Sequence, residues 1–218
     1  MRTLLLLLLT SSVLAAQAAP PAGATPMPAI APSSPPAYVV DLTTQEGMAA
    51  LNARWKNMDV KIVEAPAMPN AGAAWKTSYD IMPKAGDANF DDSSWPTIEP
   101  KGLLERRGGG HLFMTWFRTN LTVPGKIGTF DTAGAIAVLT FTIDDYAEAW
   151  VNGQMPRRVG RPSPATIQGF NMPNRVVLSE QVKAGDKFEV AILGINGPIS
   201  LAPANPVFFR EAKIEFFR

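Results

Sequence analysis

Polar side chains gather between residues 157 and 175 more densely than elsewhere in the chain. A guanidinium group forms two parallel hydrogen bonds with a carboxylate, so the arginines of this segment suit a uronic or aldonic acid. A solvated loop that tolerates charge explains the same composition equally well, and both interpretations stay open. Arg106 and Arg107, ahead of three glycines, either join this group or end the segment before them. The ligand-binding candidates here are Arg157, Arg158, Arg161, Asn171, Asn174 and Arg175.

Two pairs of adjacent aspartates are the other candidates for ligand contact. Carboxylates bind hard cations and accept hydrogen bonds from hydroxyl groups. Asp144 and Asp145 stand at the junction of two expected strands, where they either contact a ligand or bond the backbone of a turn. Asp91 and Asp92 precede two serines, a context in which aspartate commonly caps a turn. They are weaker calcium candidates, so a structural calcium ion is the one cofactor left open.

Catalysis has little support in the composition. The chain has no cysteine and a single histidine, His111, which excludes thiol catalysis, Cys-based zinc sites and multi-His metal centres. Glycoside hydrolysis needs two carboxyl groups about 5–10 Å apart. Asp144 or Asp145 with Glu148 meets that requirement in principle, but hairpin geometry supplies such pairs freely. We therefore expect no catalytic residue and lean away from an enzyme.

Short alternating segments separated by turn residues predict an all-β fold. Such a pattern, with little helix, indicates an antiparallel β-sandwich or jelly roll. A short N-terminal helix is expected within 41–55, with Thr43 or Thr44 as its cap and Met48, Leu51 and Trp55 on one face. The expected strands are 59–64, 75–82, 111–123, 135–143, 146–151, 175–178, 187–195 and 207–217.

The most informative local signal lies around residues 135–153. The two strands 135–143 and 146–151 are expected to form a hairpin joined at Asp144-Asp145. Asn152-Gly153 ends the second strand, and both residues tolerate the positive φ of a tight turn. Tyr146 and Trp150 share a face of that strand, where they either stack on a sugar or, as large aromatic residues more often do, pack against another sheet. Trp95 and Trp116 are expected in the core.

The chain begins like an exported protein. Arg2 supplies a positive start, Leu4–Leu9 an apolar core, and Ala16-Gln17-Ala18 a small-residue cleavage site, so 1–18 is expected to be a secretory signal. The apolar run is too short to span a bilayer stably. We therefore expect a periplasmic or secreted protein that is cleaved near Ala18.

A Pro- and Ala-rich segment, 19–37, follows the expected signal. It has too few bulky apolar residues to offset its ordering entropy, which predicts an extended linker. One sandwich domain is then expected over 38–218. The net charge of +1 supplies no basic excess for a phosphate backbone, so nucleic acid is not an expected partner.

Three motifs in the middle of the chain resemble a known domain. They are Phe90–Trp95, the Trp116-Phe117-Arg118 run with Val123-Pro124, and Asp144–Gly153. In this order and spacing they resemble the galactose-binding-like jelly roll, best known as the sugar-binding domain of glycoside hydrolase family 2 enzymes. That resemblance implies a β-sandwich in a carbohydrate-related setting.

A closer resemblance involves Asp41–Thr44, Phe90–Ser93, Gly169–Leu178 and Gly194–Ser200. These segments resemble an N-terminal domain of exported bacterial gluconolactonase-like proteins, where it precedes a six-bladed, calcium-dependent β-propeller. The present chain, which stops at Arg218, holds no propeller, so the catalytic carboxylates of that family have no positions here. The resemblance implies the fold of the accessory domain and not lactone hydrolysis.

The expected function is therefore an exported, non-catalytic carbohydrate-binding module that serves a sugar lactonase or glycoside hydrolase. Its ligand would be a carbohydrate or sugar acid, and no membrane span is expected. The alternative is a protein-docking module for a separately encoded β-propeller or hydrolase, for which an exposed apolar patch would be the mark. A hydrolase in its own right is the least favoured.

Overall fold

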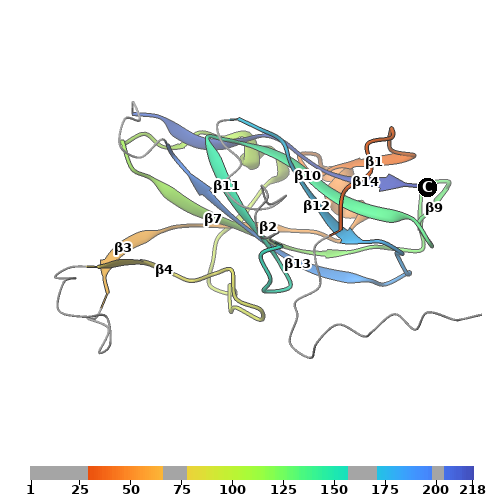
Figure 1. Ribbon diagram of the computed structural model, residues 1–218, viewed down its shortest axis with the longest axis horizontal. Helices are drawn as coiled ribbons and strands as arrows, with labels where there is room; N and C mark the ends of the chain where they lie inside the picture. Colours follow the sequence, from red (N-terminus) through yellow and green to blue (C-terminus); the bar gives the residue numbers. More distant parts are fainter. Residues whose placement is uncertain (1–28, 66–77, 157–170, 198–203) are drawn as a thin grey trace, which may run out of the picture.

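Two antiparallel sheets packed face to face make up the fold in the computed structural model, which describes residues 29–65, 78–156, 171–197 and 204–218 (Figure 1). The prediction of an all-β antiparallel sandwich with one short N-terminal helix is confirmed. The first sheet runs in the order β1 (Tyr38–Asp41), β14 (Pro206–Phe217), β10 (Ile136–Asp144) and β12 (Asn174–Ser179), and β6 (Arg107–Gly108) also pairs with β14. The second sheet runs in the order β11 (Tyr146–Val151), β13 (Lys187–Ile195), β7 (Met114–Thr122), β2 (Trp55–Asp59) and β5 (Thr97–Ile98).

Smaller elements complete the described fold. A two-stranded ribbon, β3 with β4, extends from one end of the sandwich (Figure 1). No helix in the described ranges is long and apolar enough to cross a membrane. The remaining elements are α1 (Gln45–Ala50), β3 (Lys61–Glu64), β4 (Tyr79–Met82), the 3₁₀ helix η1 (Pro100–Leu104), β8 (Lys126–Ile127) and β9 (Phe130–Asp131).

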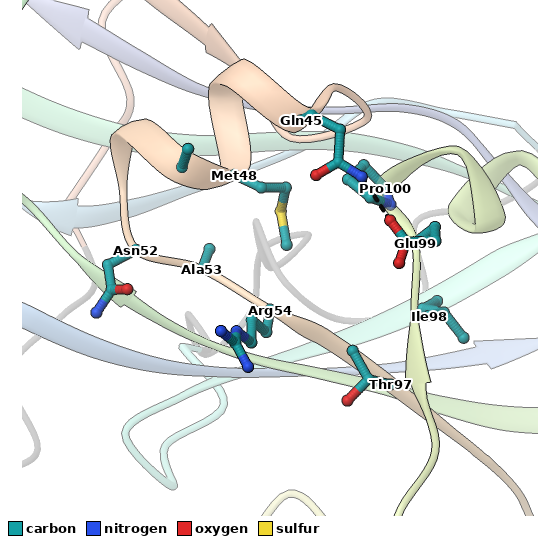
Figure 2. A pocket seen from close by; sticks show the side chains of 10 residues that line it. Gln45, Met48, Asn52, Ala53, Arg54, Thr97, Ile98, Glu99 and Pro100 are labelled. Carbon is teal, nitrogen blue, oxygen red and sulfur yellow. Dashed lines mark hydrogen bonds between the residues drawn. The ribbon is translucent and has the colours of Figure 1, made fainter.

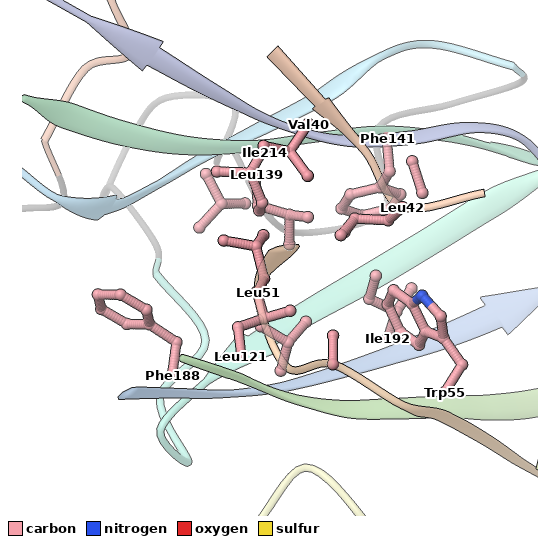
Figure 3. Close-up of a cluster of buried hydrophobic side chains, with 14 of the residues drawn as sticks. Val40, Leu42, Leu51, Trp55, Leu121, Leu139, Phe141, Phe188, Ile192 and Ile214 are labelled. Carbon is pink, nitrogen blue, oxygen red and sulfur yellow. The ribbon is translucent and has the colours of Figure 1, made fainter. Parts of the chain in front are cut away.

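The main core lies between the two sheets, where alternate residues of each strand face inward (Figure 3). Phe209 packs among three other rings, with centroids 4.8 Å from Phe117, 5.9 Å from Trp55 and 6.0 Å from Phe141. Each such side chain contributes about 1.5–3 kcal/mol through burial. This core fixes the two sheets relative to each other.

A second apolar cluster covers the outer face of the second sheet. Trp95 and Trp116 are 6 % and 2 % exposed there, as predicted for core residues. Tyr146 and Trp150 pack partly buried against the same cluster. A Cβ atom built on Gly86 would lie 2.6 Å from Trp150 Cδ2, so the segment before Trp95 presses directly on that indole ring. The aromatic side chains of β11 therefore pack under this segment, as the more common use of such residues predicts.

The prediction of a hairpin at Asp144-Asp145 is wrong. Asp144 ends β10 in the first sheet, opposite Phe208, and Tyr146 opens β11 in the second sheet, opposite Ile195. The cis peptide bond between the two aspartates lies where the chain crosses between sheets. Strand pairing is decided by partners far along the sequence, because β10 pairs with β14 over nine positions and β11 with β13 over six. The turn at Asn152-Gly153 is confirmed by φ values of +50° and +74°.

The helix is shorter than its sequence pattern suggests. Thr44 is the cap, since its hydroxyl oxygen accepts a backbone N–H in the first turn. Asn52, with φ of +46°, ends the helix by taking the left-handed conformation that asparagine tolerates. Met48 and Leu51 are buried as expected, whereas Trp55 reaches the same core from β2. The helical spacing of these three residues thus reflects a shared core and not one continuous helix.

Some expected strands shift at their ends. The expected strand 59–64 is divided between β2 and β3, and 111–123 shortens to β7. The short strands β1, β5, β6, β8 and β9 were not expected, because two to four residues carry little periodicity. Two residues of the expected linker bond to the first sheet. The Pro32 carbonyl accepts a hydrogen bond from Arg175 at 2.7 Å, and the Ala37 N–H donates to the Phe216 carbonyl at 2.7 Å. The last residues before β1 therefore contact the first sheet.

Candidate functional site

The two aspartates at the crossing lie in one hydrogen-bonded group, which we call the loop-end cluster: Asp144, Asp145, Asn171, Asn205 and Arg210. Arg210 donates from Nη2 to Asp144 Oδ2 and from Nε to Asn171 Oδ1, both at 2.6 Å. Asn205 Nδ2 donates to Asp144 Oδ1 at 3.2 Å and to both Asp145 oxygens at 3.1 Å. The predicted candidates Asp144, Asp145 and Asn171 are thus brought together.

Burial limits what the two carboxyl groups can do. Asp144 is 4 % and Asp145 1 % exposed. Burial, the hydrogen bond with Asp144 and repulsion from that carboxylate raise the pKa of Asp145 above its usual value, although N–H donors from Gly197 and Asn205 oppose the shift. The donors present already use most of the oxygen positions. The cluster therefore fastens three chain segments to the end of β10, and its rim consists of exposed Arg210 with half-buried Asn171 and Asn205.

The other predicted binding residues fall elsewhere. Asn174 is buried beside the cluster, with its Oδ1 unbonded among the described residues and its Nδ2 3.4 Å from the Met172 carbonyl. Arg175 lies on the outer face of the first sheet, where it pairs with Glu215 at 3.2 Å and covers the Phe217 ring. The contact links β12 to β14 across the strand between them, β10. The remaining candidates, Arg157, Arg158 and Arg161, lie outside the described residues.

The calcium candidates have protein partners. Asp91 accepts the Ser93 N–H at 2.9 Å, which closes a turn. Asp92 pairs with Lys56 at 2.8 Å and with Arg118 at 3.0 Å. Burial by itself raises the pKa of Asp92, but the hydrogen bonds from Lys56 and Arg118 outweigh it and hold the pKa below its usual value. No group of three or more metal-binding side chains occurs in the described ranges. The calcium role stays a prediction.

Arg118 explains why Asp92 is held so firmly. Its side chain is 2 % exposed, yet it carries a charge, so it needs close anionic partners. It donates to Asp92, to Glu189 and to the Ala85 carbonyl. These contacts tie the segment 83–95 to the outer face of the second sheet, which is a structural role.

An open groove lies along the second sheet, where Arg54 projects from β2, and we call it the Arg54 groove. It consists of two adjoining hollows of about 480 and 370 Å³ that share Asn52 and Arg54. The first opens between α1 and β5 (Figure 2). The second continues over β2 and β7. The polar residues lining the groove are Gln45, Asn52, Arg54, Thr97, Glu99 and, in the second hollow, Lys56, Asp92 and Asn120.

Local structure positions the groove residues. After Asn52 ends the helix, the chain extends into β2, and successive side chains alternate between its two faces. Ala53 and Trp55 are buried, while Asn52, Arg54 and Lys56 lie on the outer side. The sequence carried this signal as an alternation over 52–56, but the same residues were assigned to the end of a helix.

The groove holds hydrogen-bonding groups that no other described residue uses. In the described chain the Arg54 guanidinium has no hydrogen-bond or ion-pair partner, and the side chains of Asn52 and Asn120 are exposed without one. At one end Gln45 donates to Glu99 at 2.5 Å (Figure 2). Met48 supplies apolar surface to the same hollow. Free donors and acceptors beside a small apolar surface suit a ligand rich in hydroxyl groups.

No family model and no curated protein sequence matches the chain. Among solved structures, it resembles a β-glucuronidase from glycoside hydrolase family 2 at 17 % identity and a TM-score of 0.41, over 75 % of this chain and 17 % of the enzyme. A family 2 member from Bacteroides cellulosilyticus matches at 14 % identity and a TM-score of 0.44, over 75 % and 20 % of the two chains. The Bacteroides uniformis β-glucuronidase matches at 17 % identity and 0.43, over 74 % and 18 %.

The chain thus spans about a fifth of the length of these enzymes. The resemblance to the accessory domain of gluconolactonase-like proteins stays a prediction. What the described geometry adds is a polar groove whose Arg54 side chain has no partner among the described residues, together with a separate, saturated cluster of two of the predicted acidic residues.

Proposed function

We propose that this domain is an exported, non-catalytic module that binds carbohydrate in the Arg54 groove, in the service of a sugar lactonase or glycoside hydrolase. The observation that carries the proposal is that the side chains of Arg54, Asn52 and Asn120, within two adjoining hollows, have no partner in the part of the chain that the structure describes. The secretory pattern of residues 1–18 supports export.

A saccharide fits this groove better than an apolar ligand does. The hollows of about 480 and 370 Å³ fall in the range of ligand sites, about 300–1,000 Å³. Their lining offers a guanidinium, amides and the Thr97 hydroxyl, which match the alternating donors and acceptors of a sugar. Met48 and Ile98 offer the apolar contact that the ring carbons of a sugar need.

The state of the carboxyl groups in the groove and of Asp145 supports the proposal of binding without chemistry. In the groove, Asp92 is neutralised by two cations and Glu99 accepts the Gln45 amide. The pKa of Asp92 lies below its usual value, which makes Asp92 a poor proton donor. Asp145 has a raised pKa but is 1 % exposed, so a glycosidic oxygen cannot reach it.

Titration of the purified domain with neutral and acidic saccharides tests the proposal. We expect binding at millimolar concentration, with NMR shifts at the side-chain amides of Asn52 and Asn120. Arg54→Ala should weaken binding about tenfold, the loss of one charge-assisted hydrogen bond of about 1.5 kcal/mol. Lys126→Ala, at a residue that lines neither hollow of the groove, is the matched control and should bind as the wild type does. A glycan panel without any bound saccharide would refute the proposal.

A second candidate function is docking onto a separately encoded β-propeller or hydrolase. The observation that favours it is an apolar hollow of about 500 Å³ at the β3–β4 ribbon. Its lining includes Ile62, Tyr79 and Leu112, which are 46 %, 70 % and 42 % exposed. Exposed apolar side chains gathered in one place commonly mark an interaction surface.

A further inference from the structure

A second set of arginines meets on the outer face of the first sheet. β6 pairs with β14 so that Val207 lies opposite Arg107, and one further step in this antiparallel register places Arg106 opposite Phe208. Val207 and Phe209 are buried in the core, so Phe208 between them faces outward. Arg210 follows two positions later. We call Arg106, Phe208 and Arg210 the arginine patch.

The arginine patch is built around one aromatic ring. The guanidinium carbon of Arg106 lies 5.0 Å from the centroid of Phe208, and that of Arg210 lies 5.3 Å from it. Such cation–π contacts hold a guanidinium in place through its charge without using its N–H donors. The donors of Arg106 have no acceptor among the described residues, whereas Arg210 gives two of its donors to Asp144 and Asn171. The side chain of Arg210 is 50 % exposed and Arg106 is exposed, so both can be reached from solvent.

Within the described residues, one of the two positive charges of the arginine patch, that of Arg106, has no carboxylate partner. Arg210 is paired with Asp144, but no described carboxylate contacts Arg106. The nearby Glu105 instead lies 3.7 Å from Arg107. The rim of the loop-end cluster adds the Asn171 side chain, which is fixed by Arg210. An open guanidinium beside a second, oriented guanidinium suits a planar carboxylate.

We infer that the arginine patch binds the carboxylate of an acidic saccharide, with Arg106 as the main contact and Arg210 as the second. The patch lies on the first sheet, whereas the Arg54 groove lies on the second, so this site is separate from the one proposed above and stands even if the groove binds nothing. Together the two sites would let one domain hold two parts of one acidic glycan or two separate glycan chains.

Titration with glucuronate and galacturonate tests the inference, with glucose, galactose and acetate as comparison ligands at constant ionic strength. We expect NMR shifts at the Nε–H of Arg106 and Arg210 with both uronates and none with the neutral sugars. Arg106→Gln should raise the Kd for the uronates about tenfold or more, the usual effect of losing a charge-assisted contact. Arg54→Ala should leave these shifts unchanged, which separates this site from the groove.

Arg218→Gln is the matched control, because Arg218 also lies over a phenylalanine ring, at 5.1 Å from the centroid of Phe130. It should bind uronates as the wild type does. Arg210→Gln is not used, because it also breaks the pair with Asp144. Phe208→Leu is the second variant in its place. Thermal unfolding checks that each variant is folded. Any one of four results would overturn the inference. Glucose could cause equal NMR shifts, or Arg106→Gln could bind uronates with unchanged affinity. Arg218→Gln could lose as much affinity as Arg106→Gln, or acetate could bind as tightly as the uronates.

Discussion

Asp145 is the residue at which burial and charge are most clearly in conflict. It is 1 % exposed and adjoins a second buried carboxyl group, so its pKa is raised by burial and by Asp144. A carboxyl group with a higher pKa in the folded state binds protons more tightly there than in the unfolded chain. Its contribution to stability is therefore present at low pH and is lost as the pH rises from the ordinary value of 3.8 through the folded pKa.

Asp145→Asn should flatten this part of the pH profile. The amide stays neutral at every pH and keeps a carbonyl oxygen for the Gly197 N–H. We expect the variant to be at least as stable as the wild type at pH 7, with a smaller loss of stability between pH 4 and 7. Urea unfolding across that pH range is the measurement. A variant that is clearly less stable at neutral pH would mean that the charged form is the one the fold needs.

At the scale of elements, the segment 83–95 is held to the second sheet by one buried cation, Arg118. Arg118→Met removes that cation and leaves Asp92 and Glu189 facing an apolar side chain. Breaking a buried pair in this way costs about 3–5 kcal/mol. We expect a loss of about that size in the free energy of unfolding by urea. Lys84→Met, which breaks an exposed pair with Asp80, is the control and should change stability far less.

Long strands could be predicted from the sequence, whereas their partners could not. The bounds of β11 and β13 match the expected ranges because both are apolar runs bounded by turn residues; β11 alternates in burial, whereas β13 is buried on both faces from Val190 to Ile195. The hairpin at Asp144-Asp145 failed because the pairing of β10 with β14 depends on residues more than sixty positions away. Asn205 and Arg210 were missed for the same reason: only the folded chain brings them to the two aspartates.

The Arg54 groove could not be predicted either, although each of its residues was visible. The groove is the space between α1, β5 and β7. This space is present because the helix ends at Asn52 and the chain then extends into β2. Trp95 and Trp116 were placed correctly in a core, but the sequence did not show that there are two apolar clusters on opposite faces of one sheet.

At the scale of the whole molecule, the second candidate function predicts a partner protein. If the apolar hollow at the β3–β4 ribbon is a docking surface, a tagged domain should retain a β-propeller or glycoside hydrolase from a periplasmic extract. The purified partner should then bind the wild type, and Ile62→Ser with Tyr79→Ser should weaken that complex about tenfold or more, because both side chains are exposed in the free domain. Saccharide binding in the groove should be unchanged in this variant. Equal binding of the partner by wild type and variant would exclude this surface.

The indole of Trp150 pressed against Gly86 has a practical consequence. Of the five tryptophans in the chain, Trp95, at the end of the segment 83–95, and Trp116 belong to the outer cluster, and Trp150 packs against it. Their fluorescence emission therefore reports on that outer layer more than on the space between the sheets. Lifting of the layer would redden the emission while the β-sheet circular dichroism signal stayed intact, which gives the protein a built-in optical probe that needs no label.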